Sequence, residues 1–73
     1  MPSSVIRRFA YESDRRELLV EFVSGRRYVY EEVPPGVVDS FRAAFAKGVY
    51  FNTRIRDAFR FRDVSGEDPD TLF

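Results

Sequence analysis

The chain has 73 residues, 44% of them apolar and 16% aromatic, which is enough for one small domain with a true core. It contains no Cys and no His, and this excludes disulfide bonds, the common zinc sites and any Ser-His or Cys-His catalytic pair within the chain. The net charge is zero, but residues 1–62 hold twelve basic and eight acidic residues, a net charge of +4, whereas residues 63–73 hold four acids and no base.

Three strands are predicted in the first half of the chain. Residues 5–11 are rich in β-branched and aromatic side chains, and either a bulge or the Ser3-Ser4 pair would turn Ile6 inward. A turn at residues 12–16 leads into the second strand, residues 17–23, and the third strand covers residues 26–33.

The second hairpin has two alternative registers. A three-residue loop over residues 23–25 pairs Val20 with Tyr28 and puts Gly25 at the left-handed position that such loops require. A two-residue loop over residues 24–25 would move the tyrosines to the opposite face. The apolar pattern favours the three-residue loop, which gathers one face from Leu18, Val20, Phe22, Tyr28 and Tyr30.

A main helix is predicted to open at Pro34-Pro35 and to end at Gly48. Asp39 near its start and Lys47 near its end complement the helix dipole. Its apolar stripe contains Val37, Val38, Phe41, Ala44 and Phe45.

The last third of the chain predicts a short second helix and a final strand. Asn52 is the expected cap of this helix, which would bury Tyr50 or Phe51 with Ile55. Residues 58–64 then alternate as a strand. The side chains expected to point inward are Phe59 and Phe61, and those expected to point outward are Arg60 and Arg62.

These elements predict an α+β fold, namely a three- or four-stranded antiparallel β-meander with one main helix and one short helix packed on one face. Residues 1–62 are the expected single domain, and residues 63–73 the expected acidic flexible C-terminal tail. Three roles are open for the tail: a solubilising end, a transient cover over the basic residues, or a C-terminal recognition motif at residues 71–73.

An ordered set of short motifs carries a family resemblance. The set comprises SSVI at 3–6, Tyr11, Leu18, Val20, Phe22, Gly25, YVY at 28–30, VP at 33–34 and GVYFNTRIR at 48–56. In this order and spacing the chain resembles the KTSC domain over residues 3–62, with Phe59 standing where the family more often has Tyr. The family is named for its occurrence at the C-terminus of some lysyl-tRNA synthetases and also occurs as free-standing small bacterial proteins. The resemblance implies no established activity, and the synthetase fusion suggests RNA binding.

Tyrosines and arginines are the candidate binding residues. Tyr28 and Tyr30 belong either to the core or to an exposed stacking platform. Eleven of the twelve basic residues are arginines, which suit contacts with phosphates and nucleobases but also ordinary pairing with carboxylates on a solvated face. The full candidate set for nucleic-acid binding is Arg26, Arg27, Tyr28, Tyr30, Arg54, Arg56, Arg60 and Arg62.

Nothing in the sequence forms a catalytic constellation. Glu31 and Glu32 are adjacent on a predicted strand and point to opposite faces, so they do not form an acid–base pair. We therefore expect a small non-catalytic bacterial accessory domain, without cofactor or metal, that binds RNA or another single-stranded nucleic acid through an Arg-rich face. The alternative is a protein–protein adaptor using a sheet edge or an apolar patch. Without an apolar run of about 20 residues or a signal-peptide pattern, we expect no membrane association and a cytoplasmic location.

Overall fold

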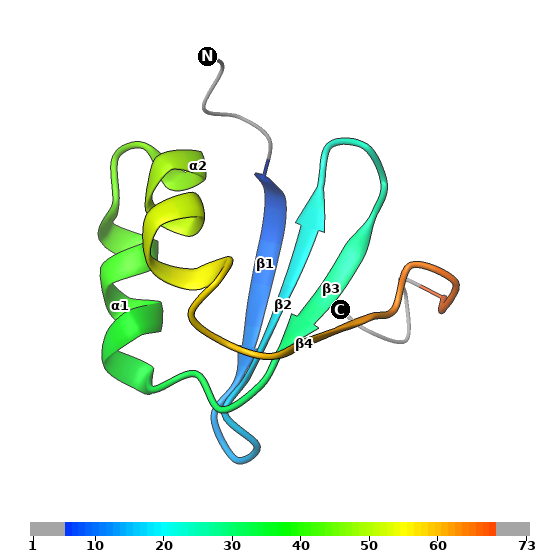
Figure 1. Cartoon of the computed structure of the whole chain (residues 1–73), viewed down its shortest axis with the longest axis horizontal. Helices are drawn as coiled ribbons and strands as arrows, with labels where there is room; N and C mark the ends of the chain where they lie inside the picture. Colours follow the sequence, from blue (N-terminus) through cyan, green and yellow to red (C-terminus); the bar gives the residue numbers. More distant parts are fainter. Residues whose placement is uncertain (1–5, 69–73) are drawn as a thin grey trace.

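The computed structural model describes residues 6–68, in which four antiparallel strands form one sheet in the order β1-β2-β3-β4 (Figure 1). The α+β prediction is confirmed, with four strands and with the helices inserted between β3 and β4. The strands are β1 (Ile6–Glu12), β2 (Glu17–Phe22), β3 (Arg27–Tyr30) and β4 (Phe61–Asp63). The helices are α1 (Pro35–Ala43) and α2 (Lys47–Tyr50), and α2 runs on into the π-helical segment η1 (Phe51–Ile55).

The β2–β3 hairpin has the register that the apolar pattern favours. Val20 pairs with Tyr28 and Leu18 pairs with Tyr30, and the loop is closed by a hydrogen bond of 2.9 Å from the Gly25 N–H to the Phe22 carbonyl. Gly25 has a φ of +95°, in the left-handed region that a three-residue loop requires. Tyr28 and Tyr30 therefore face the same side of the sheet as Leu18 and Val20.

Strand β1 contains the predicted irregularity. The register shifts between Ile6 and Arg8, and Ile6 packs partly buried against the core. A bulge therefore turns this residue inward, as expected from the sequence. Val5 and the Ser3-Ser4 pair lie outside the described residues.

The core lies between one face of the sheet and the helices. Figure 1 shows α1 and α2 side by side as a single layer beside the sheet. Phe41 of α1 is fully buried, and its ring centroid lies 4.4 Å from that of Phe9 and 5.8 Å from that of Tyr50. The fully or almost fully buried residues of this cluster are Leu18, Val20, Tyr30, Val33, Val38, Phe41, Phe51 and Ile55.

Helix α1 ends earlier than the sequence suggested. Ala44 already has extended backbone angles, and the Lys47 ammonium donates hydrogen bonds to the Arg42 and Ala44 carbonyls at 3.0 and 2.6 Å. Gly48 is thus buried inside α2 and does not terminate α1. The prediction that Phe45 belongs to the apolar stripe is wrong, because this side chain lies beyond the end of the helix and is fully exposed.

One further sequence prediction about the second half is also wrong: Asn52 lies inside the continuous α2–η1 helix, so it does not cap a helix start. Phe59 and Phe61 point toward the helix side as predicted, since Phe59 packs against the core and the Phe61 ring contacts those of Tyr28 and Tyr30. Phe61, on the edge strand β4, nevertheless remains 54% exposed. Phe51 and Ile55 are buried as predicted.

The chain beyond Arg62 packs on the helix-free face of the sheet. Asp63 ends β4, and Val64 is buried with Leu19 and Val29 in a second small cluster. The packed part of the chain therefore continues past residue 62, where the sequence suggested that a flexible tail begins. Residues 69–73 of that tail lie outside the described residues.

Candidate nucleic-acid interface

The eight candidate residues are divided among different surfaces of the domain. Successive residues of a strand point to opposite faces, and the hairpin register puts Tyr28 and Tyr30 on the helix side. Arg27 and Arg62 face the other side, where Arg62 pairs with Val29 across β3 and β4. The sequence order in "RRYVY" therefore alternates between two surfaces.

Four of the candidates meet in one groove. It lies between the end of the β2–β3 hairpin and the start of η1 and has a volume of about 320 Å³. We call it the aromatic groove, and its lining residues are Phe22, Arg26, Tyr28, Tyr30, Phe51, Asn52 and Arg56.

Edge-to-face ring contacts hold the walls of the aromatic groove in place. The Phe22 ring meets those of Tyr28 and Phe51 at centroid distances of 5.6 and 5.3 Å, and the Tyr30 ring meets that of Phe51 at 5.4 Å. Such T-shaped pairs are preferred because the positive edge of one ring faces the negative face of the next. The groove is therefore built from side chains that the core already fixes.

No carboxylate lines the aromatic groove among the described residues. A larger concavity of about 740 Å³ beside the β1–β2 hairpin is lined by four acidic side chains and two arginines. A third concavity, of about 550 Å³, is lined by Glu31 and Asp57 as well as Arg56 and Arg60. Of these three hollows, the aromatic groove is the one whose charge is wholly positive, and it suits an anionic ligand best.

The arginines on the helix side keep their guanidinium groups available. Arg26 makes a long contact of 3.5 Å with the Tyr28 hydroxyl, and neither Arg26 nor Arg56 has an ion pair within 4 Å among residues 6–68. The Arg26 charge does reach Asp63, whose pKa is lowered by hydrogen bonds from Ser65 and less strongly by Arg26. Arg56 lines both the aromatic groove and the third concavity, which Arg60 and Phe61 share. This side therefore carries three arginines beside exposed aromatic surface, with two carboxylates among the residues of the third concavity.

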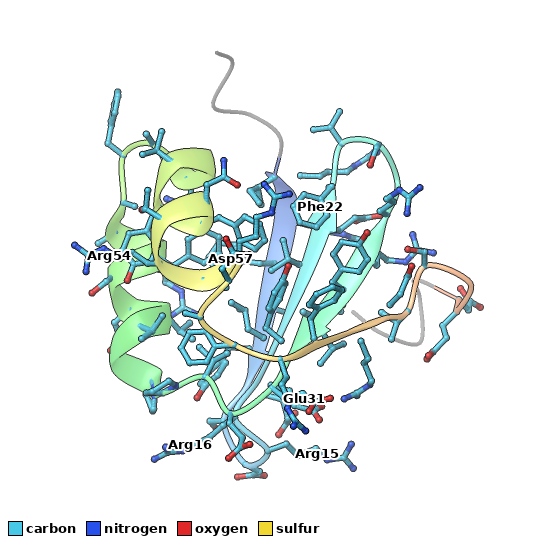
Figure 2. All side chains as sticks on the ribbon, in the orientation of Figure 1. Arg15, Arg16, Phe22, Glu31, Arg54 and Asp57 are labelled. Atoms are coloured by element: carbon cyan, nitrogen blue, oxygen red, sulfur yellow. The ribbon has the colours of Figure 1, made fainter. Side chains whose placement is uncertain are left out.

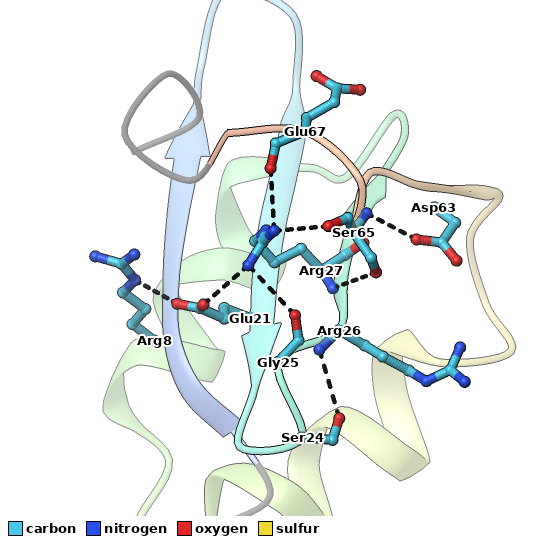
Figure 3. A network of polar contacts seen from close by, with 9 residues as sticks. All are labelled: Arg8, Glu21, Ser24, Gly25, Arg26, Arg27, Asp63, Ser65 and Glu67. Carbon is cyan, nitrogen blue, oxygen red and sulfur yellow. Dashed lines mark hydrogen bonds and ion pairs between the residues drawn. The ribbon is translucent and has the colours of Figure 1, made fainter.

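Arg27, in contrast, is used within the fold, as Figure 3 shows. Its side chain is 11% exposed and contacts Glu21 at 3.3 Å, and it donates to the Ser65 and Glu67 carbonyls at 2.7 and 3.0 Å. A hydrogen bond of 2.5 Å from Arg8, followed by the contacts with Arg27, holds the pKa of Glu21 below its usual value although burial of this carboxylate opposes the shift. We call this set the Arg27 clamp, because it holds residues 64–67 against the sheet.

Arg62 is also engaged by carboxylates. Its guanidinium lies 3.2 Å from a Glu17 oxygen and 3.3 Å from a Glu31 oxygen. Hydrogen bonding to Glu17, and less strongly to Glu31, raises the pKa of Arg62. A phosphate group would have to compete with both carboxylates at this position.

Arg54 belongs to neither set. It is exposed on η1, and Figure 2 shows it on the side of the helix layer that faces away from the sheet. It therefore lies apart from the aromatic groove, although it is only two residues from Arg56.

The two tyrosines differ in their surroundings. Tyr30 is 2% exposed, and burial, followed by the nearby Tyr28, raises the pKa of Tyr30 to about 12. Tyr28 is half-buried, and its ring centroid lies 5.1 Å from that of Phe61. Tyr30 is therefore a core residue, whereas Tyr28 packs partly buried against the core and keeps part of its ring accessible.

Sequence reasoning did not include Asn52, Phe51, Phe22 or Phe61 among the binding residues. The shared parity of Phe22 with Tyr28 was visible in the hairpin, but the approach of η1 to the hairpin is a tertiary contact. Within residues 6–68, no cluster of three or more acidic side chains is placed to hold a metal ion, and no helix has the length and apolarity to cross a membrane.

The fold and its groove define a small α+β domain with a carboxylate-free aromatic hollow on the helix side of the sheet. The chain belongs to the KTSC domain family, whose model matches residues 2–59, and the resemblance seen in the sequence is thereby confirmed. The crystal structure of a KTSC domain protein from Yersinia pestis matches with a TM-score of 0.82 and 31% identity, covering 88% of this chain and 90% of that one.

The chain is also similar in sequence to two different kinds of protein. The chain is 42% identical over 62 residues to a lysine–tRNA ligase of Nostoc punctiforme, which covers 85% of this chain and 11% of the ligase. It is also 42% identical over 52 residues to an uncharacterized protein of Stutzerimonas stutzeri, covering 71% of this chain and 73% of that protein. The chain thus spans about one tenth of the ligase and most of the smaller relative.

Proposed function

We propose that this KTSC domain is a non-catalytic module that binds single-stranded RNA along the helix side of its sheet. The observation that carries the proposal is the aromatic groove, which brings together four aromatic rings and two arginines without an ion pair, and which no carboxylate of residues 6–68 lines. Stacking surfaces combined with a cationic path are the usual means by which proteins hold single strands. The similarity to part of a lysine–tRNA ligase is compatible with this function.

Each arginine has a distinct part in the proposal. Arg26 and Arg56 contact phosphates at the two ends of the aromatic groove, and Arg60 extends the path toward β4. Arg27 and Arg62 support the sheet through their carboxylate and carbonyl partners. Phe61 offers a second exposed ring next to Tyr28 for a neighbouring base.

The test is fluorescence anisotropy with a labelled RNA of about eight nucleotides over a series of salt concentrations. Binding should weaken with salt, and log affinity should fall against log salt by roughly 0.7 per phosphate contact on a single strand. The double variant Arg26→Ala/Arg56→Ala should reduce this slope by about 1.4, the value for two contacts.

A matched control separates the site from overall charge. The double variant Arg15→Ala/Arg54→Ala removes the same two charges from exposed positions outside the aromatic groove. It should retain most of the slope and affinity. Equal losses in the two double variants, or no RNA binding by the wild type at low salt, would contradict the proposed function.

A protein-adaptor function is favoured by a different observation. Phe45 is fully exposed and Val49 is 55% exposed in the segment from the end of α1 into α2. Exposed aromatic residues are common binding anchors in protein interfaces. An adaptor using these residues would bind its partner with little dependence on salt, and Phe45→Ser would abolish that binding while leaving the RNA titration unchanged.

A further inference from the structure

The aromatic groove contains hydrogen-bonding groups that the fold does not use. Only 2% of the Tyr30 surface is exposed, and the residue lines the groove with a hydroxyl that has no hydrogen-bond partner within residues 6–68. The Asn52 amide, from the opposite wall, also has none in the described part of the chain. Within residues 6–68 the one buried side-chain polar atom left unpaired is Arg27 Nε, so the Tyr30 hydroxyl is accessible from the groove and free to hydrogen-bond a guest.

The chemistry of the walls restricts what that partner is. Arg26 and Arg56 repel a cationic guest, although aromatic hollows often bind one. They attract negative charge to the groove, whose other lining residues offer aromatic rings and a few hydrogen-bonding groups. A neutral heteroaromatic ring between two phosphates has this distribution of charge and polarity, and it is the repeating unit of a nucleic-acid strand.

We infer that the aromatic groove receives one unpaired nucleobase of a bound RNA strand, whose edge is hydrogen-bonded by the Tyr30 hydroxyl and the Asn52 side-chain amide. The inference rests on the proposed function and adds selectivity to it. Asn52 supplies both a donor and an acceptor, and so does a phenol that remains protonated. A base in a duplex has its pairing edge occupied, so the groove selects single strands over double strands.

The groove dimensions agree with a guest of this size. Its volume of about 320 Å³ lies at the small end of the range of about 300–1,000 Å³ for ligand pockets. One base therefore enters, and its neighbours remain outside on exposed surfaces such as Phe61.

Variants that leave the fold intact test the inference. Tyr30→Phe removes a hydroxyl without an internal partner, and Asn52→Ala removes an exposed amide from a helix, so neither should lower the melting temperature. Each should weaken binding of the labelled RNA octamer by about threefold to tenfold without changing the salt slope. Tyr11→Phe is the matched control, because the Tyr11 hydroxyl donates to the Val33 carbonyl at 2.6 Å; it should lower the melting temperature but leave RNA binding unchanged.

The decisive comparison changes the RNA. An octamer whose central nucleotides lack bases keeps every phosphate and should bind at least about fivefold more weakly, and a duplex of the same sequence should also bind more weakly. Equal binding of the intact and abasic strands, with the same salt slope, would overturn the inference and leave RNA binding by the arginines standing. Failure of every RNA to bind at low salt would overturn the proposed function as well.

Discussion

Replacing Phe41 by Ala removes the aromatic ring at the centre of the main core. The ring is fully buried, and it contacts the Phe9 ring at 4.4 Å and the Tyr50 ring at 5.8 Å between centroids. A buried Phe→Ala change costs about 3–5 kcal/mol, and each aromatic pair contributes about 0.5–1.5 kcal/mol beyond burial. We therefore expect Phe41→Ala to lower the free energy of unfolding by about 4–5 kcal/mol, in the upper part of that range.

This loss is comparable with the whole stability of the domain. At about 0.05–0.15 kcal/mol per residue, a chain of 73 residues has a free energy of unfolding of about 4–11 kcal/mol. Urea unfolding followed by circular dichroism should show that Phe41→Ala is largely unfolded or has a strongly lowered midpoint.

Phe45→Ala provides the matched control, since Phe45 is only four residues away but fully exposed. Its free energy of unfolding should change by less than about 0.5 kcal/mol. If Phe41→Ala melted within a few degrees of the wild type, the position of α1 over the sheet would be wrong. If Phe45→Ala were as destabilising as Phe41→Ala, the early end of α1 would be wrong.

Three further predictions concern the backbone, pH and the C-terminal segment. Gly25→Val should lower the free energy of unfolding by about 1–2 kcal/mol through the left-handed backbone alone, because a Cβ there meets no other atom; an unchanged urea midpoint would exclude this conformation. Burial raises the pKa of Tyr30 from 10.0 to about 12, so the folded state keeps this proton longer than the unfolded chain, and wild-type stability should fall as pH rises from about 10 to 12. Urea midpoints of Tyr30→Phe should lack this part of the fall, and identical profiles would contradict it. Truncation after Val64 should lower the melting temperature because Arg27 loses its Ser65 and Glu67 acceptors; an unchanged melting temperature would show that these contacts contribute nothing.

Local chemistry explains which parts of the fold the sequence predicted well. The hairpin register follows from one glycine and an alternating apolar pattern, and both act within a few residues of the loop. The inward turn of Ile6 could be expected in the same way, because regular strand alternation would point this apolar side chain to the face opposite Phe9 and Tyr11. The helix end at Ala43 could not, since Lys47 and the following helix compete with the continuation of α1.

The candidate site was only partly predictable for a similar reason. Strand alternation separates Arg26 from Arg27, but the partners that occupy Arg27 include Ser65 and Glu67, far along the chain. Likewise, the aromatic groove requires η1 to approach the hairpin, and no short motif near Asn52 indicates that contact. The sequence therefore showed which residues are basic. Which of these residues are occupied by carboxylate or carbonyl partners depends on contacts between segments far apart in the chain.

The insertion of the helices between β3 and β4 has a consequence for how the domain folds. Strands β1, β2 and β3 pair through short hairpins, whereas β4 reaches β3 only after the whole segment 31–60 has closed into a loop. Closing a long loop has a larger entropic cost than closing a hairpin, so the meander should form before β4 docks. Arg26, Tyr28 and Tyr30 are then in position before Phe51, Asn52 and Arg56 arrive, and the aromatic groove is completed late in folding. An RNA strand bound across both walls of the aromatic groove would slow the detachment of η1 and β4. Amide hydrogen exchange in those two segments should therefore be slower when the groove is occupied.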